Sequence, residues 1–265
     1  MEVYEFTAGR TPLLVSMPHV GTYIPPGIAD TMTPEARAVP DTDWHVDRLY
    51  DFLEELGTAR IRATHSRFVI DLNRAPDDRP LYPGASNTEL CPTSLFDERP
   101  IYRPGAAPDP AEIAARRERY WRPYHDRLAA ELASLRERFG FAVLFDAHSI
   151  RSEVPRFFAG RLPDLNIGTG GGGTAAPELA ARVLEAAAEA EGYTSVLNGR
   201  FQGGYITRHY GRPDEGIHAL QLELSQITYM EEDPPFAFRE DRADSIRPVL
   251  RRILQTILDW AAEQK

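Results

Sequence analysis

The sequence has very little cysteine and no long apolar stretch. It contains one cysteine, Cys91, and no run approaching the about 20 apolar residues that a membrane-spanning helix needs. A single cysteine excludes an internal disulfide, and a chain of 265 residues can bury a core without one. The first ten residues lack the basic and then apolar pattern of a signal peptide. We therefore expect a cytoplasmic protein that does not bind membranes.

Basic residues are also scarce relative to acidic ones. The chain has 30 Lys and Arg against 40 Asp and Glu, which gives a formal net charge of −10. Such a surface repels nucleic-acid phosphates, and the sequence has no basic stripe with interleaved aromatic residues. Nucleic acid is therefore not an expected partner. A small acidic metabolite stays possible, because a few arginines gathered locally are enough to bind it.

The pattern of apolar residues predicts an α/β fold. Short apolar stretches predict strands at 13–17, within 59–72, and at 141–145, 193–197 and 219–224. Apolar residues at helical spacing predict helices over 44–56, over 111–139 with an interruption at Pro123, over 176–190 and over 246–263. Strands that alternate with helices favour a mixed or mostly parallel sheet with helices on both faces. The sequence shows no repeat or linker, so we expect one domain over residues 1–265.

Two segments are predicted to be loops. Residues 75–110 are rich in Pro, Gly, Asp and Asn, which is typical of a long functional loop. Residues 168–174 read GTGGGGT, which lacks the Lys-Ser/Thr ending of a phosphate-binding P-loop. We interpret this second segment as a mobile loop over the site.

Candidate chemistry lies where predicted strands end, because active sites of open α/β sheets collect at the carboxyl ends of strands. His19 and His148 each follow an apolar stretch, and Glu223 lies near the end of another. An acidic cluster that contains Asp41 and Asp43 stands at a predicted helix start. A catalytic zinc needs three N or O ligands and one open position, and a free carboxylate nearby can act as base. The residues alone leave open structural histidines, a solvated helix start and a buried ion pair.

A family resemblance favours the metal site. The segments that carry it are SMPHVGTYIP (16–25), DTDWHVDRLYDF (41–52), SRFVIDLNRAP (66–76), YWRPYH (120–125), DAHS (146–149), GGYITRHYG (203–211) and LQLELSQITYM (220–230). In this order they resemble N-formylglutamate deformylases, which are related to zinc carboxypeptidases and aspartoacylases. The resemblance implies a zinc-exopeptidase-like α/β fold and an active site of two histidines and an acidic residue around one zinc, although another divalent metal is possible.

The resemblance implies His19 and His148 as zinc ligands and Glu223 as general base. One departure concerns the third ligand, because the related enzymes place a glutamate three residues after the first histidine, where this chain has Thr22. Asp43 and Asp41 are the candidates for that ligand, with Asp43 preferred.

Arginines supply the predicted substrate contacts. Asn73 and Arg74 resemble the pair that binds the substrate α-carboxylate, and a guanidinium suits a carboxylate because two parallel bonds can form. Arg67 resembles the arginine that supports the developing oxyanion. For a second substrate carboxylate the candidate is Arg208, with Tyr205 or His209 as a helper.

The implied reaction is hydrolysis of N-formyl-L-glutamate to formate and L-glutamate, the last step of one route of histidine degradation. Two alternatives stay open: a related zinc amidohydrolase acting on another N-acyl acidic amino acid, and a non-catalytic metal- or carboxylate-binding protein on the same scaffold. The sequence does not give the oligomeric state.

Overall fold

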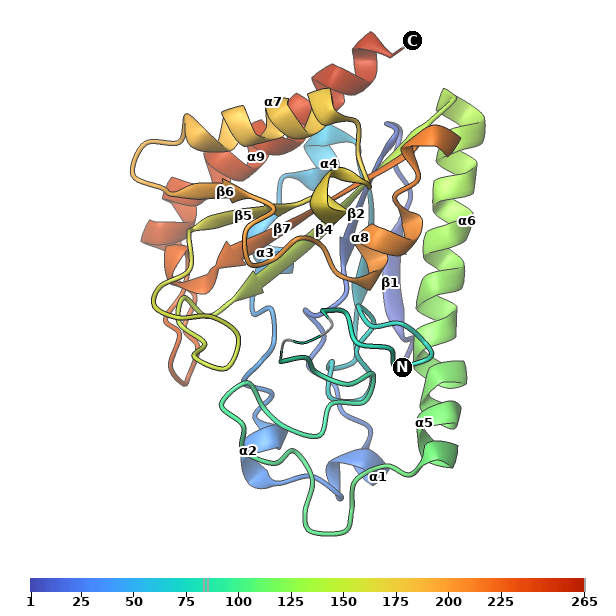
Figure 1. Ribbon diagram of the computed structural model, residues 1–265, viewed down its shortest axis with the longest axis vertical. Helices are drawn as coiled ribbons and strands as arrows, with labels where there is room; N and C mark the ends of the chain where they lie inside the picture. Colours follow the sequence, from blue (N-terminus) through green and yellow to red (C-terminus); the bar gives the residue numbers. More distant parts are fainter. Residues whose placement is uncertain (83, 85, 265) are drawn as a thin grey trace.

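The computed structural model describes residues 1–82, 84 and 86–264 and contains a mixed β-sheet. In the order β1-β3-β2-β4-β7-β5-β6, the described strands form one seven-stranded sheet (Figure 1). Their bounds are Tyr4–Thr7 (β1), Leu13–Met17 (β2), Ala59–Ala63 (β3), Ala142–Ile150 (β4), Leu165–Gly168 (β5), Ser195–Leu197 (β6) and Ile217–Ser225 (β7). This arrangement confirms the predicted α/β fold with a mixed sheet.

The centre of the sheet is parallel and its two sides are not. Strands β3, β2, β4 and β7 pair in parallel, whereas β1 is antiparallel to β3 and β5 is antiparallel to β7. Parallel strands bring their carboxyl ends to one edge. Near that edge lie three residues that were predicted to be functional: His19 after β2, His148 in β4 and Glu223 in β7.

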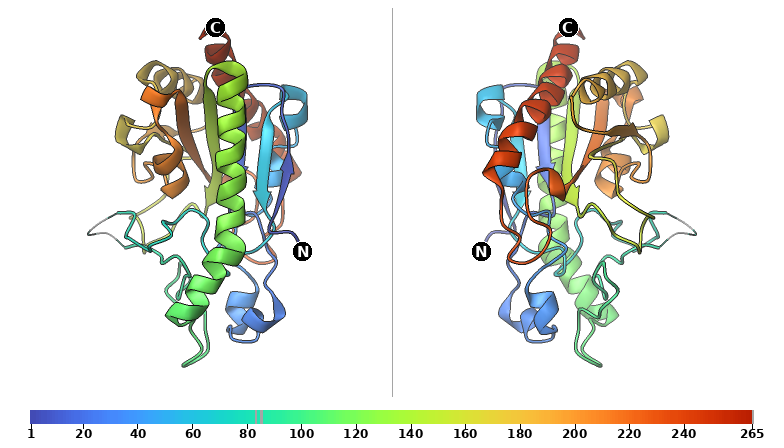
Figure 2. Two further views of the ribbon diagram at one scale, coloured as in Figure 1. Left: turned by 90° about the vertical axis from the view of Figure 1, so that its right-hand side faces the viewer. Right: turned by 90° about the vertical axis from the view of Figure 1, so that its left-hand side faces the viewer.

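Helices cover both faces of the sheet (Figure 2). The longer ones are α5 (Pro110–Arg116), which continues through a π-helical turn (Arg117–Trp121) into α6 (Arg122–Phe139), then α7 (Pro177–Ala188), α8 (Tyr205–Tyr210) and α9 (Glu240–Glu263). Short helices are α1 (Pro26–Ala29), α2 (Pro34–Arg37), α3 (Val46–Leu49) and α4 (Leu53–Leu56), with 3-10 turns at Gly170–Gly172, Pro213–Glu215 and Gln226–Thr228. In the described part of the chain, none of these helices has the length and apolar character needed to cross a membrane.

The central strands β2, β4 and β7 are buried on both faces along most of their length, so alternate side chains enter two separate cores. Val143 and Phe145 of β4 pack in the core that holds α3, α4, α7 and α9. Ala142 and Leu144 pack in the other core, with α6 and α8. Asp146 and His148 continue the second set and therefore point to the α6 side of the sheet.

Several predicted elements have different bounds in the structure. The helix predicted over 44–56 is two short helices, α3 and α4, separated by a turn. Within 59–72 only β3 is a strand, and residues 67–69 form a buried turn. The strand expected to stop before Asp146 runs on to Ile150, so His148 lies inside β4. Burial of a whole strand removes the apolar-to-polar boundary that would mark its end.

The long helix is interrupted just before the predicted position. Pro123 lies in the first turn of α6 and has no backbone N–H to donate to the preceding turn. The π-helical turn 117–121 comes directly before it, and π-turns are a known way to accommodate such a break inside a helix. The break is therefore confirmed, with the helix continuing across it.

The remaining chain forms the lower part of the molecule in Figure 1. Residues 75–109 contain no helix or strand among the described positions, only isolated bridges such as Ser94 to Pro100, and α5 begins at Pro110. This segment and the chain around α1 and α2 lie below the carboxyl edge of the central strands. The predicted long loop is confirmed, and it supplies one wall of the cavity described next.

Candidate active site

The main polar side chains of the candidate site come from two central strands and from the turn after a third. His19 follows β2 by two residues, whereas His148 and Glu223 lie inside β4 and β7. His148 and Glu223 are directly paired in the β4–β7 register. Paired residues on neighbouring strands project to the same face. The two side chains therefore lie next to each other on the α6 side of the sheet.

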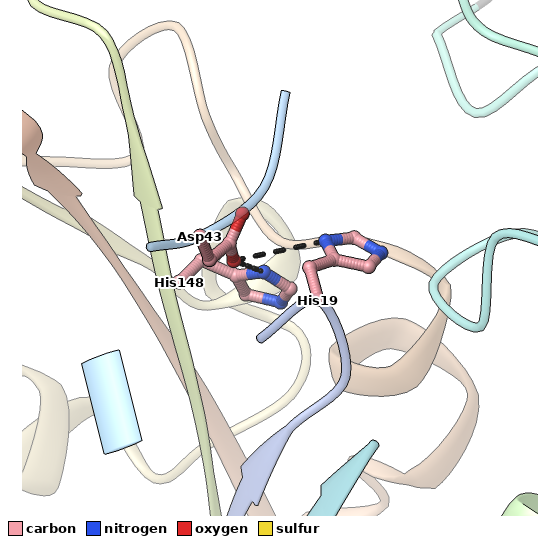
Figure 3. Close-up of side chains that lie close together, drawn as sticks. All are labelled: His19, Asp43 and His148. Carbon is pink, nitrogen blue, oxygen red and sulfur yellow. Dashed lines mark hydrogen bonds and ion pairs between the residues drawn. The ribbon is translucent and has the colours of Figure 1, made fainter. Parts of the chain in front are cut away.

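Asp43 joins the two histidines in a buried cluster (Figure 3). Its Oδ2 lies 2.9 Å from His148 Nδ1 and 3.7 Å from His19 Nδ1. One donor atom from each of the three residues lies within 4.8 Å of the others. All three residues are at most 3% exposed. This group could hold a metal ion.

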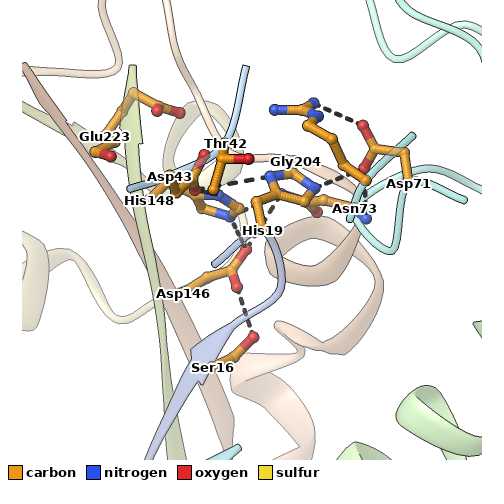
Figure 4. Close-up of polar contacts among 12 residues, drawn as sticks. Ser16, His19, Thr42, Asp43, Asp71, Asn73, Asp146, His148, Gly204 and Glu223 are labelled. Carbon is orange, nitrogen blue, oxygen red and sulfur yellow. Dashed lines mark hydrogen bonds and ion pairs between the residues drawn. The ribbon is translucent and has the colours of Figure 1, made fainter. Parts of the chain in front are cut away.

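Each histidine is held at its other ring nitrogen by a carboxylate (Figure 4). His19 Nε2 lies 2.7 Å from Asp71 Oδ1, and His148 Nε2 lies 2.9 Å from Asp146 Oδ2. A carboxylate at the far nitrogen fixes the tautomer and leaves Nδ1 free to bind a cation, as is usual for metal-ligating histidines. Ser16 Oγ in turn donates to Asp146 Oδ1 over 2.8 Å. Both imidazoles are thus oriented before any metal binds.

The three donors fit a zinc ion in number, type and spacing. Ligand atoms at about 2.0–2.2 Å in tetrahedral geometry lie about 3.4 Å from one another. The two distances from Asp43 Oδ2, 2.9 and 3.7 Å, lie on either side of that value. Two imidazoles and one carboxylate are a common ligand set of catalytic zinc, with a position left for water. The donor set therefore suits zinc, and it also suits other divalent transition metals.

The electrostatics of the cluster favour a cation. Burial alone would lower the pKa of His148, but the carboxylates of Asp146 and Asp43 outweigh it and hold the pKa well above its usual value. His19 differs, because burial and the nearby Arg67 together lower its pKa despite the neighbouring carboxylates. A bound metal would take the place of the proton on His148, since a ligating imidazole must be unprotonated.

Glu223 lies beside the cluster but is not one of its three donors. Burial raises its pKa to about 8, and the neighbouring His148 opposes the rise. Its Oε2 accepts a long hydrogen bond, 3.4 Å, from Gln221 Nε2. A divalent cation at the cluster would favour the ionised carboxylate. Glu223 is thus placed to be a proton acceptor that does not bind the metal.

Asp41 lies outside the cluster. Its Oδ2 accepts a 2.9 Å hydrogen bond from the backbone N–H of Phe96, and burial raises its pKa to about 6. The metal-competent group contains Asp43 and not Asp41. Of the two aspartates that sequence patterns offered as third ligand, the geometry therefore favours Asp43.

A cavity opens onto the cluster. Among the residues that line it are the predicted functional residues His19, Arg67, Asn73, Arg74, His148 and Glu223. The wall opposite the sheet comes from the long loop and from residues 200–204.

Arg67 and Asp71 form a buried ion pair beside His19. Arg67 Nη2 donates to Asp71 Oδ2 over 2.6 Å, and the guanidinium stacks near the ring of Phe96 at 4.9 Å. Burial would raise the pKa of Asp71, but Arg67 and His19 hold it well below its usual value. Asp71 therefore stays ionised and orients both a predicted metal ligand and a predicted oxyanion donor.

Arg74 is fixed by three hydrogen bonds that leave part of its fork free. Nε donates to Thr88 O (3.0 Å), Nη1 to Asn73 O (3.0 Å) and Nη2 to Thr88 Oγ1 (2.7 Å). A guanidinium has five N–H groups, so within the described part of the chain one remains without a partner on each terminal nitrogen. Two such groups on a side chain that lines the cavity can bind one carboxylate.

Asn73 also lines the cavity, but both ends of its amide have partners in the protein. Oδ1 accepts from the backbone N–H of Ile206 at 2.8 Å, and Nδ2 lies 3.3 Å from Asp146 Oδ2 and 2.9 Å from His148 Nε2. The tight packing requires glycine at 204, because a Cβ there would lie 2.2 Å from Asn73 Nδ2. The geometry therefore favours a positioning role for Asn73, which holds His148 and Asp146, rather than direct binding of the substrate.

The structure does not place Arg208 in this cavity. Arg208 lines a separate hollow, and its Nε donates to Gly203 O over 2.8 Å. Its suggested helpers, Tyr205 and His209, line the same hollow, together with Arg79 and Arg212. Residues 205–210 form helix α8, which turns the side chains of Tyr205, Arg208 and His209 away from the cavity. A glycine-rich sequence gave no sign of this short helix.

The glycine-rich segment also lies apart from the cavity. In the described part of the chain, none of residues 168–174 lines it, and this segment instead contains the 3-10 turn Gly170–Gly172.

Sequence reasoning missed Asp71, Asp146 and Gln221 as supporting residues. A signal for two of them existed, because Asp146 precedes His148 by two residues and Gln221 precedes Glu223 by two. Residues two apart on a strand share a face. Asp71 had no comparable signal, since it lies in an irregular segment.

The chain is similar to known proteins over most of its length. The family model described as N-formylglutamate amidohydrolase matches residues 11–230. The chain is 54% identical to an N-formylglutamate deformylase of Pseudomonas aeruginosa and 53% identical to one of Pseudomonas putida. In both cases the match covers 99% of this chain and 98% of the relative.

A solved structure of an N-formylglutamate amidohydrolase from Ralstonia eutropha JMP134 superimposes with a TM-score of 0.82. It is 28% identical, and the match covers 99% of this chain and 98% of that one. A gene product of Agrobacterium tumefaciens, 19% identical over 97% of this chain and 96% of its own, has a TM-score of 0.71 and shares the fold.

Proposed function

The chain belongs to the N-formylglutamate amidohydrolase family, and on that premise we propose that it hydrolyses N-formyl-L-glutamate to formate and L-glutamate. The relatives of matching length carry the name of this activity. The observation that carries the proposal is the joint placement of Glu223 and the His19–Asp43–His148 cluster at one cavity. A place in histidine degradation stays a prediction.

His19, Asp43 and His148 are proposed to hold one zinc ion. When bound, zinc supplies Lewis-acid chemistry, because it lowers the pKa of a coordinated water toward neutrality and polarises a carbonyl group. Asp71 and Asp146 keep the two imidazoles in the orientation that binding needs.

Glu223 is proposed as the general base. It accepts a proton from the water whose oxygen forms a new bond to the formyl carbon. It then passes that proton to the amide nitrogen as the carbon–nitrogen bond breaks, so that formate and a free amine leave. A buried carboxylate with a raised pKa returns a proton readily, which suits this double role.

Arg67 and Arg74 are proposed to contact the developing oxyanion and the substrate α-carboxylate, respectively. Arg67 lines the cavity beside His19 and supports negative charge that develops on the formyl oxygen. Arg74 binds the α-carboxylate through the two N–H groups that its protein partners leave free. Both arginines are held by other residues before substrate arrives, which reduces the entropy lost on binding.

Two alternatives are less well supported. An amidohydrolase with another N-acyl acidic substrate would need the same cluster and the same arginines, so only the assay separates it. A non-catalytic binding protein has no use for a buried carboxylate such as Glu223 next to a metal-competent cluster.

We expect the purified protein to release formate from N-formyl-L-glutamate and to lose that activity after treatment with a chelator. Re-addition of Zn²⁺ should restore it, because the cluster offers three ligands and no other source of a Lewis acid is proposed. The measurement is enzymatic detection of formate, with N-acetyl-L-aspartate as the rival substrate. A faster reaction with the rival would overturn the proposed substrate, and full activity in excess chelator would overturn the metal.

A second expectation concerns Arg74. Arg74→Lys keeps the charge and loses the planar fork, so one of two bonds to the α-carboxylate should be lost. A charged hydrogen bond contributes about 1.5–3 kcal/mol, which corresponds to a roughly 10- to 150-fold fall in kcat/KM.

The control substrate for the Arg74 variant is the α-amide of N-formylglutamate, which lacks the α-carboxylate that the guanidinium is proposed to bind. Steady-state kinetics should show that Arg74→Lys costs little on this amide. Thr88→Val provides a control variant, since it removes one bond that orients Arg74 and leaves the guanidinium in place. An equal loss on acid and amide would mean that Arg74 acts only by holding the loop.

A further inference from the structure

The proposed substrate has one more carboxylate than the arginines so far assigned can bind. No lysine stands among the described residues that line the cavity, so a side-chain cation from that lining must be an arginine or a histidine. Arg67 is already paired with Asp71, and Arg74 is assigned to the α-carboxylate. The histidines of the cavity belong to the metal-competent cluster. The side-chain carboxylate of glutamate therefore still needs a partner.

Arg200 is a third arginine that lines the cavity. It lies between β6 and α8, where Nε donates to Phe157 O over 2.6 Å. That is its only hydrogen bond in the described part of the chain, and no described carboxylate pairs with it. Both terminal nitrogens, with four N–H groups, remain for a ligand.

The cavity around Arg200 suits a short apolar spacer that ends in a charge. Tyr82 and Phe201 lie with their ring centroids 5.1 and 5.3 Å from its guanidinium carbon. Phe157 and Leu81 complete this part of the lining. Aromatic and aliphatic walls match the two methylenes of a glutamate side chain.

Other nearby arginines do not meet these conditions. Arg156 donates to Ser86, Asn87, Ser94 and Leu95, which uses most of its N–H groups, and it does not line the cavity. Arg208 also lies 5.0 Å from the Tyr82 ring, but it faces the separate hollow. Tyr82 thus contacts both arginines and shares the cavity with only one of them.

We infer that Arg200 binds the side-chain carboxylate of the substrate and so selects N-acyl derivatives of acidic amino acids. The inference rests on the proposed function, and it gives Arg200 the role that the sequence pattern had suggested for Arg208. Arg200 is a specificity residue because its contact is to a part of the substrate that does not react.

The test compares Arg200→Gln with the matched variant Arg208→Gln on N-formyl-L-glutamate and N-formyl-L-glutamine. The two substrates have nearly the same shape and differ in the side-chain charge. The measured quantity is the ratio of their kcat/KM values, which does not depend on the fraction of enzyme that is folded. For Arg200→Gln this ratio should fall roughly 10- to 150-fold, as expected for one lost charged bond, through a loss on the acid alone. For Arg208→Gln it should stay within about threefold of wild type, since a change outside the cavity removes no such bond.

Three outcomes would overturn the inference. An unchanged ratio in Arg200→Gln would mean that another group reads the side-chain carboxylate. An equal loss on both substrates would place Arg200 at the α-carboxylate, which they share. A fall of the ratio in Arg208→Gln alone would restore the sequence-based assignment.

Wild-type enzyme separates failure of this inference from failure of the proposed function. A wild-type protein that cleaves neither substrate would overturn the function itself. A wild-type protein that prefers N-formylglutamate, together with an unchanged ratio in Arg200→Gln, would overturn only the assignment of Arg200.

Discussion

Glu223→Gln should reduce formate release by a factor on the order of 10²–10⁴ and leave metal content near that of wild type. The amide has nearly the shape of the carboxylate and cannot accept the proton. Metal binding should persist because Glu223 is not among the three clustered donors. Elemental analysis and steady-state kinetics on the same preparation measure both quantities.

A control is needed because any change at a buried glutamate can disturb the fold. Glu131 provides it, since it is 5% exposed and pairs with Arg127 on α6, and it does not line the cavity. Glu131→Gln should keep activity within about threefold of wild type, as expected of a change away from the site. If Glu223→Gln loses its metal together with its activity, Glu223 is a ligand and the role of base must pass to another group.

Much of the site could be predicted because parallel strands impose a strong constraint. Apolar stretches marked β2, β4 and β7, and the carboxyl ends of parallel strands meet at one edge. His19, His148 and Glu223 were therefore expected to converge, and the structure places them at one cavity. The choice of Asp43 over Asp41 could not follow from strand logic. Both lie in an irregular segment, where the backbone path decides which side chain faces the histidines.

The least predictable part was the far wall of the cavity. It comes from the long loop and from residues 200–204, which have no periodic pattern. Arg208 appeared suitable because it follows glycines, yet the helix α8 directs it into another hollow. Arg200 gave no sequence signal, because an arginine in a loop is usually a solvated surface residue. The Tyr82 hydroxyl links the two segments, because it accepts a 3.2 Å hydrogen bond from the backbone N–H of Gln202 and donates to Gly203 O over 3.4 Å.

His148→Ala should remove most of the bound zinc and abolish measurable deformylation. Two remaining donors compete poorly with water for the ion. Loss of a carboxylate that merely orients a ligand already costs roughly 10- to 100-fold in metal affinity, so loss of the ligand should cost more. Zinc per chain, measured after dialysis against a weak chelator, is the readout.

The two aspartates give this prediction its matched control. Asp43→Asn should also lose zinc, because it removes the only carboxylate charge among the three donors. Asp41→Asn changes another buried aspartate two residues away and keeps an oxygen that can accept from Phe96 N, so zinc should stay. Circular dichroism would show whether each variant is folded. If His148→Ala does not fold, Asp43→Asn still tests the metal site. Full zinc in Asp43→Asn together with loss in Asp41→Asn would exchange the two assignments. Full zinc in His148→Ala would mean that the zinc is bound elsewhere and that hydrogen bonds alone hold the cluster together. The chemistry proposed for Glu223 would then have no metal beside it.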